Sequence, residues 1–251
     1  MLDEGLRPMG HNTIQEAVTD YIRRAISEGQ FVPGEKLNYS ELSRNMEVSI
    51  TPIREAMRVL DAQGLVTIST YKSASVASLT IEEIQQIYEI RKNLECVAVK
   101  EAVNNIDPQT LERLKQVVAD LDEAATALGK GRNPESLKTD VMNIQELHRQ
   151  FHKLILVGAG NRFLLRIVEF LRGHLGPYFS FSARAISDSR QFRMDEHHGI
   201  MRAFAEKDAG LAASQMRKHL DITCETLVDY IHSRTAQQAV TSKKIGRVSV
   251  N

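Results

Sequence analysis

The sequence predicts a mainly α-helical protein that carries one small β-hairpin in its N-terminal third. Apolar residues recur at helical spacing along most of the 251 residues. One short region, 65–79, is instead rich in β-branched residues and predicts two strands, 65–69 and 73–79. Hydrophobic residues make up 42% of the chain and charged residues 25%, which is typical of a globular protein and not of a disordered or membrane-embedded one.

Three helices are expected before the hairpin. Residues 13–29 carry an apolar stripe at helical spacing that ends at Gly29. A Pro-Gly turn follows, and then a short second helix over 39–46, capped by Ser40. These elements lead directly into a third helix.

The third helix is contained in "SITPIREAMRVLDAQGLV", residues 49–66. Ser49 or Thr51 is expected to cap it, Pro52 suits its first turn, and Gly64 ends it. Its expected buried stripe is Ile53, Ala56, Met57 and Leu60.

Three helices followed by a two-stranded hairpin is the order of a winged helix-turn-helix, whose recognition helix enters the DNA major groove with its N-terminal end. Arg54 and Arg58 are four residues apart and share a face that could meet phosphates or base edges. The alternative is an ordinary amphipathic helix with a solvated charged face. The formal net charge of +0 gives no overall attraction to nucleic acid, so any DNA affinity depends on local placement of cations.

The remaining chain is expected to be almost entirely helical. Helices are expected from residue 81, from Pro108 and from Pro134, and a further one to about His174. "GPYFSFSARAISDS", residues 176–189, interrupts the pattern, and two last helices meet near Asp208. The expected domains are a flexible tail over 1–11, a DNA-binding domain over 12–78, an all-helical effector-binding and dimerisation domain over 79–235, and a flexible tail over 236–251.

Histidines are concentrated in the helical part. His148 and His152 are spaced i, i+4, so they project from one helix face and can share a metal. His197 and His219 are equally distant in sequence from Asp208, so a helical hairpin around Asp208 would bring both to the same height. The alternative is histidines scattered on helix surfaces or hydrogen-bonded in the core.

The stretch "PGEKLNYSELSRNMEVSITPIREAMRVLDAQGLV", residues 33–66, resembles the DNA-binding signature of GntR-family bacterial transcription regulators. Ile50 stands where that family usually has a DNA-contacting arginine. The resemblance implies a double-stranded operator DNA as partner and a homodimer. The residues expected to bind DNA are Ser49, Thr51, Pro52, Arg54, Arg58 and, in the wing, Lys72.

Residues from about 80 to 232 resemble the all-helical FCD effector domain of the FadR-type branch of this family. The resemblance rests on "IYEIRKNLE" (87–95), "HRQFHKLILVGAGN" (148–161) and "EHHGIMRAFAEKDAGLAASQMRKHL" (196–220). It implies a divalent metal, zinc or alternatively nickel, and His148 occupies the place of the family's usual aspartate. The implied ligands are His148, His152, His197 and His219.

Two further residues are candidates for binding the effector. Arg91 lies on the apolar face of its helix, and its guanidinium matches the geometry of a carboxylate. An ion pair with Glu95 is the alternative, and the two can hold in different ligation states. His174 also lies near an apolar face, where it either lines the effector cavity or is a core histidine.

The sequence therefore predicts a cytoplasmic transcription regulator, not an enzyme, controlled by a small organic or sugar acid bound near a metal. No apolar run is long enough for a membrane span. The chain shows no convincing catalytic Ser/His/Asp or Cys/His arrangement and no Gly-rich phosphate loop. A regulator that senses the metal itself, or a metal-dependent enzyme carrying a DNA-binding domain, remains as an alternative.

Overall fold

The computed structural model describes residues 13–27, 29–70, 73–128, 134–189 and 194–248. Within them it contains nine helices and one three-stranded antiparallel sheet, which confirms the predicted fold class. Contacts divide the chain into two compact units. Unit 1 holds the residues up to Thr80 together with the segment Arg172–Tyr178, and unit 2 holds the rest. The expected tail over 1–11 lies outside the described residues.

Unit 1 is built around helix α3 (Ile50–Ala62), which packs against α1 (Ile14–Ser27) and α2 (Tyr39–Asn45). The stripe predicted for α3 is fully buried and forms the centre of the core. Ile14, which belongs to the apolar stripe expected over 13–29, is 54% exposed because it is the first residue of α1. Gly64 adopts a φ of 71° just after α3, a left-handed conformation that glycine takes without steric cost.

The wing consists of β2 (Val66–Thr70) and β3 (Ser73–Val76), as predicted. A third strand, β1 (Lys36–Asn38), was not predicted. It pairs with β3 in the order β1-β3-β2, with Leu37 opposite Ala74. Leu37 is buried between two exposed neighbours, so this strand contributes one side chain to the core.

Two helix starts differ from expectation. The N-cap of α2 is Asn38 and not Ser40, because the Asn38 side-chain oxygen accepts hydrogen bonds from the backbone N–H groups of Ser40 and Glu41. Ser49 does occupy the N-cap position of α3, but its side chain makes no capping hydrogen bond.

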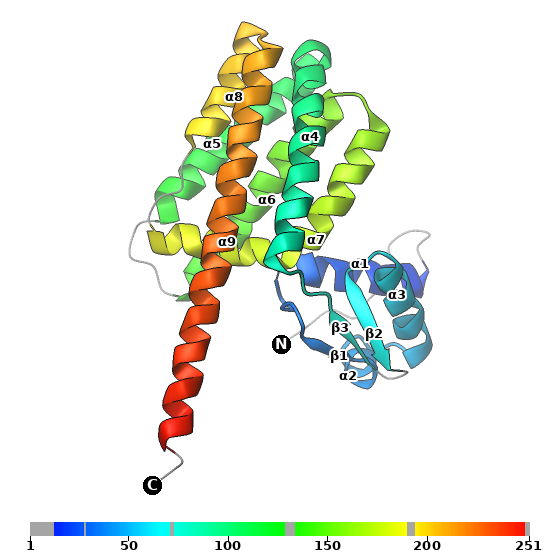
Figure 1. The fold of residues 1–251 in the computed structure, drawn as a ribbon. Coiled ribbons are helices and arrows are strands. Elements are labelled where there is room, and N and C mark those ends of the chain that lie inside the picture. The colour runs from blue at the N-terminus through cyan, green and yellow to red at the C-terminus, as the bar shows by residue number, and fades with distance from the viewer. Residues whose placement is uncertain (1–12, 28, 71–72, 129–133, 190–193, 249–251) are drawn as a thin grey trace. The chain divides into compact units, whose positions relative to one another are not determined.

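Unit 2 is a bundle of long helices (Figure 1). Its helix α4 packs against α6 and α9, while α5 packs against α6 and α8 lies along α9. The helices are α4 (Ile81–Asn105), α5 (Pro108–Leu128), α6 (Pro134–Gly158), α8 (Asp195–Glu206), α9 (Ala209–Val248) and α7 (Arg162–Ser189), of which the segment Arg172–Tyr178 belongs to unit 1.

Two of these helices run further than expected. The predicted break over 176–189 is wrong, because α7 continues through Pro177 to Ser189. Leu175 and Tyr178 beside the proline are buried, which indicates that packing outweighs its local helix-breaking effect. Helix α9 continues to Val248 where a flexible tail was expected, and no proline interrupts residues 235–248.

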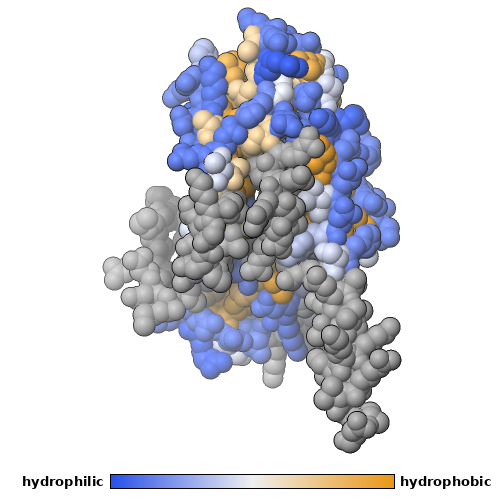
Figure 2. Space-filling model, turned by 90° about the vertical axis from the view of Figure 1, so that its left-hand side faces the viewer, coloured by the Kyte–Doolittle hydropathy of each residue, from blue (hydrophilic) through white to orange (hydrophobic). Residues whose placement is uncertain are grey.

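Figure 2 shows one face of the molecule, on which hydrophilic residues predominate and apolar residues form small separate patches. Such patches are ordinary on the surface of a globular protein. Of the helices that the structure describes, none is both long and apolar enough to cross a membrane.

Candidate functional site

Helix α6 supplies the first two histidines of the candidate site. His148 and His152 are one turn apart, so both rings leave the same face of the helix, and their centroids are 4.7 Å apart. His152 is fully buried and His148 is half-buried. The i, i+4 spacing read from the sequence therefore does place the two rings together.

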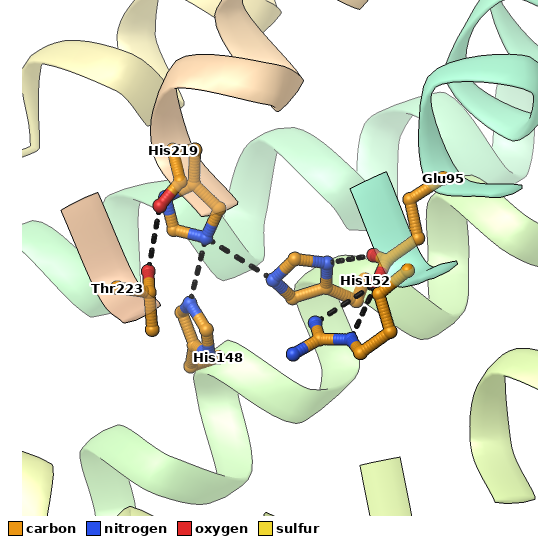
Figure 3. A network of polar contacts seen from close by, with 6 residues as sticks. Glu95, His148, His152, His219 and Thr223 are labelled. Carbon is orange, nitrogen blue, oxygen red and sulfur yellow. Dashed lines mark hydrogen bonds and ion pairs between the residues drawn. The ribbon is translucent and has the colours of Figure 1, made fainter. Parts of the chain in front are cut away.

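Helix α9 supplies the third histidine, His219, which is also buried. Its Nε2 atom lies 3.0 Å from Nε2 of His148 and 3.2 Å from Nε2 of His152. Figure 3 shows the three rings turned toward one another, two from α6 and one from α9. Three nitrogen atoms of the same kind thus converge on one point.

This donor set fits a divalent cation. Nitrogen ligands about 2.0–2.1 Å from a zinc ion, at tetrahedral angles, lie about 3.3 Å from one another. The two close nitrogen contacts here are near that separation, and imidazole is a good ligand for zinc and nickel. The metal-ligand group within the described residues is His148, His152 and His219, whose ligand atoms all lie within 4.8 Å of one another.

His197, the fourth predicted ligand, borders this group without being part of it. Its buried ring, from α8, lies 4.5 Å from the ring of His219 and 5.5 Å from that of His148, measured between centroids. Phe151 packs against the same ring at 4.8 Å. The structure thus brings all four predicted histidines together, three of them with converging nitrogen atoms.

Burial keeps two of these rings in the neutral form that binds metals. Desolvation, reinforced by the charge on His198, lowers the pKa of His197 to about 4. Desolvation likewise lowers the pKa of His219 well below its usual value, and His197 and His152 add to the effect. A neutral imidazole needs to release no proton before it coordinates a cation.

A buried ion pair adjoins the cluster. Arg91, only 1% exposed, donates a hydrogen bond from Nε to Oε1 of Glu95 at 2.8 Å, and its Nη2 forms an ion pair with the same oxygen at 2.8 Å. The other carboxylate oxygen of Glu95 lies 2.5 Å from Nδ1 of His152. Arg91 is buried, as its place on the apolar face predicts, and the ion pair with Glu95 that was the alternative to effector binding is formed.

The remaining terminal nitrogen of Arg91, Nη1, is buried and makes no hydrogen bond within the described residues. A buried guanidinium nitrogen without an acceptor is costly, because it has lost its water. It is therefore a ready donor for an incoming carboxylate oxygen.

His174 lies half-buried in α7, in the segment that groups with unit 1, whereas the histidine cluster is in unit 2. Its assignment to the effector site stays a prediction. A separate pocket of about 380 Å³ is lined by residues of α5 and α6, among them Asp120, Glu123 and Asp140, and contains none of the predicted site residues.

Four of the six candidate DNA-binding residues lie at the N-terminal end of α3. Ser49 and Thr51 are exposed, while Pro52 and Arg54 are partly buried. Arg58 is exposed and pairs with Glu55 at 2.9 Å, which offsets part of its charge. Lys72 lies outside the described residues. Contact of these side chains with DNA stays a prediction.

Sequence reasoning missed the link between Glu95 and His152. The sequence indicates Glu95 only as a partner for Arg91, four residues away on the same helix. Its contact with His152 spans 57 residues and joins two helices, so no local spacing could have indicated it.

Two family models match the chain. Residues 14–76 match the model for bacterial regulatory proteins of the gntR family, and residues 86–222 match the FCD domain. These matches correspond to the helix-turn-helix and wing of unit 1 and to the helical bundle of unit 2 that contains the histidine cluster.

Similar proteins point to the same family. The transcriptional regulator YdhC of Bacillus subtilis is 30% identical over 210 residues, which cover 82% of this chain and 87% of YdhC. The transcriptional repressor GlaR of Escherichia coli is 28% identical over 203 residues, which cover 80% of this chain and 89% of GlaR.

Solved structures show the same fold. McbR/YncC of E. coli superposes with a TM-score of 0.75 at 22% identity, over 87% of this chain and 99% of that one. A GntR regulator from Rhodococcus superposes with a TM-score of 0.67 at 20% identity, over 86% of this chain and 97% of that one. From its two matched domains and its relatives, the chain belongs to the GntR family of bacterial regulatory proteins, in the branch with an FCD domain, and is a DNA-binding transcription regulator.

Proposed function

We propose that this regulator changes its affinity for an operator when a small organic or sugar acid binds beside a metal in the helical bundle. The metal is a divalent cation, zinc in the first instance and nickel as the alternative. The protein acts in the cytoplasm as a homodimer, with residues 12–78 binding DNA and residues 79–235 binding effector and partner subunit.

The DNA-binding part of the proposal rests on α3. Its N-terminal end carries the exposed N-cap Ser49 and the exposed Thr51 next to Arg54, and its opposite face is held in the core by the buried stripe. In a two-fold dimer, two copies of α3 would meet successive half-sites of a pseudo-palindromic operator. Ile50, 40% exposed at the start of the helix, offers no hydrogen bond to a base.

The convergence of three Nε2 atoms beside a buried arginine is the observation that carries the metal and acid proposal. His148, His152 and His219 would hold the cation, and His197 stands next to them. When bound, the cation supplies a positive charge and an open coordination position for one carboxylate oxygen. Nη1 of Arg91 would donate to a further oxygen of the same acid.

Elemental analysis tests the metal. Protein reconstituted with zinc or nickel should hold one ion per chain. His152→Ala and His219→Ala should lose most of it, because each removes a converging nitrogen. His148→Asp should keep it, since a carboxylate also binds zinc. The exposed His198, which pairs with Asp122 and not with the cluster, provides the matched control His198→Ala. Near-zero metal in the reconstituted wild type would refute this part of the proposal.

A thermal-shift screen of organic and sugar acids, run with and without zinc or nickel, tests the effector. Acids that bind at the site should raise the melting temperature more in the metal-loaded protein than in the metal-free one. If no acid changes either melting temperature or operator affinity, the acid-sensing proposal is wrong.

A metal-responsive regulator is the second candidate, and the position of His197 favours it. If this ring rotates inward, four histidines close the coordination shell, as in structural zinc sites. Titrating metal and acid separately against operator binding distinguishes the two functions. Only a metal sensor would respond fully to the metal without any acid.

A further inference from the structure

Glu95 occupies an unusual position between the candidate arginine and the candidate metal ligands. It is 1% exposed, and its two carboxylate oxygens have different partners. Oε1 accepts a hydrogen bond from Nε of Arg91 on the same helix α4 and forms an ion pair with its Nη2, whereas Oε2 contacts Nδ1 of His152 on α6. Figure 3 shows Glu95 and the His219 ring on opposite sides of the His152 ring.

This contact determines which ring nitrogen of His152 carries the proton. The guanidinium of Arg91, which is always charged, pairs with Glu95 as an ionised carboxylate, and an ionised carboxylate accepts hydrogen bonds and donates none. The proton in the contact between Glu95 and His152 therefore belongs to Nδ1. In a neutral imidazole the lone pair is then on Nε2, which lies 3.2 Å from Nε2 of His219 at the point where the three nitrogens converge.

We propose that Glu95 is a positioning residue that keeps Nε2 of His152 available to the metal and joins this ligand to Arg91 through one carboxylate. The inference rests on the proposed function, since it assigns Glu95 a role toward the same metal and the same arginine. Carboxylates that orient metal-binding histidines in this way contribute about 10- to 100-fold to metal affinity.

Replacing Glu95 by glutamine tests the role at constant size. An amide has an oxygen in place of one carboxylate oxygen and an NH₂ group in place of the other, so only one of the two positions can still accept a hydrogen bond. The guanidinium of Arg91 has only donors, so it binds the amide oxygen of the glutamine. The NH₂ group of the glutamine then faces Nδ1 of His152. His152 must then accept at Nδ1 and carry its proton on Nε2, where it blocks the metal.

A second substitution should reverse this effect. In Arg91→Met/Glu95→Gln no cation competes for the amide oxygen, which can turn to Nδ1 of His152 and restore the Nε2 lone pair. The double variant also avoids leaving one charge of the pair buried alone. Glu89→Gln is the matched control, because Glu89 is an exposed glutamate of the same helix that pairs with Lys92 at 2.7 Å.

Zinc affinity, measured by competition with a chromophoric chelator, is the first readout. Glu95→Gln should bind zinc about 10- to 100-fold more weakly than the wild type. Glu89→Gln should match the wild type, and the double variant should recover most of the loss. A wild-type affinity in Glu95→Gln, or a double variant as weak as Glu95→Gln, would overturn the proposal.

The tautomer of His152 in the metal-free protein, read by ¹⁵N NMR of the imidazole, is the second readout and does not depend on metal binding. The wild type should carry the proton on Nδ1 and Glu95→Gln on Nε2. If the wild type binds no zinc, the metal proposal fails while the NMR result still decides the role of Glu95. A wild-type proton on Nε2, or an unchanged tautomer in Glu95→Gln, would show that Glu95 does not position the ring.

Discussion

At the scale of single residues, the histidine cluster is governed by the cost of burying charge. An imidazolium ion inside a helical bundle loses its hydration, so the neutral ring is favoured and the pKa falls. His197 and His219 both show this effect, and His197 and His152 lower the pKa of His219 further. The converging rings of His148, His152 and His219 therefore form a candidate metal site, beside the neutral ring of His197.

The same burial predicts how stability depends on pH. The folded protein takes up a proton on His197 near pH 4, whereas the unfolded chain does so near its ordinary pKa of 6.5. Between these values the unfolded state binds more protons, so the free energy of unfolding decreases as the pH falls. The contribution of neutral His197 to the free energy of unfolding is complete above pH 6.5 and is lost by about pH 4. The free energy of unfolding changes by about 3 kcal/mol over this range.

Urea unfolding of the metal-free protein between pH 7 and 4 measures this dependence. His197→Gln removes the titrating group while keeping a polar side chain, so its unfolding free energy should change less with pH than that of the wild type. His219 contributes in the same direction and remains in both proteins. Equal slopes in the two proteins would contradict the assignment to His197.

At the scale of single elements, the start of α2 depends on one side chain. Asn38→Ala removes the oxygen that accepts from the N–H groups of Ser40 and Glu41, and should destabilise the helix by about 1 kcal/mol. Native-state hydrogen exchange of the full-length protein should show faster exchange of the α2 amides. Asn45→Ala, at the exposed C-terminal residue of the same helix, is the control and should leave this exchange unchanged.

Helix α3 carries the prediction on DNA binding. Arg54→Ala should weaken binding to an operator selected from random DNA with the wild-type protein. If Arg54 contacts a base, its removal should weaken the binding free energy by about 1–3 kcal/mol. If it contacts a phosphate, the slope of log affinity against log salt concentration should become smaller in magnitude by about one. Arg202→Ala removes an equally charged, exposed side chain from α8 and should not change the affinity. If Arg54→Ala binds the operator as tightly as the wild type at the same salt concentration, Arg54 does not contact DNA.

The elements also show what the sequence could and could not predict. The buried stripe of α3 follows from helical periodicity, and the pairing of His148 with His152 follows from their spacing. Strand β1 was missed because a three-residue strand has little local pattern and depends on β3, far along the chain. The predicted helix ended before Pro177 because proline breaks helices by local rules, whereas in the structure α7 continues through it. The contact of Glu95 with His152 depends on tertiary packing alone, so no local pattern could predict it.

At the scale of the whole molecule, regulation requires a coupling free energy between the effector site and the operator. If an acid changes operator affinity by some factor, bound operator must change the affinity for the acid by the same factor. The chain must therefore have two arrangements that the acid binds with different affinity. Arg91 is the proposed contact for that discrimination, because its buried Nη1 has no hydrogen-bond partner among the described residues.

Arg91→Met/Glu95→Gln should separate metal binding from the response to acid. The methionine cannot donate to a carboxylate, while the glutamine can still orient His152, so the metal should stay and the acid response should disappear. Fluorescence anisotropy of labelled operator, titrated with an acid found in the thermal-shift screen, measures this response. Without acid, the double variant should bind operator as tightly as the wild type.

Lys92→Met/Asp221→Asn is the control. It removes another ion pair of α4, formed at 2.8 Å with α9, and should keep the full response to the acid. A double variant at Arg91 and Glu95 that still responds to the acid like the wild type would show that Arg91 does not bind the effector.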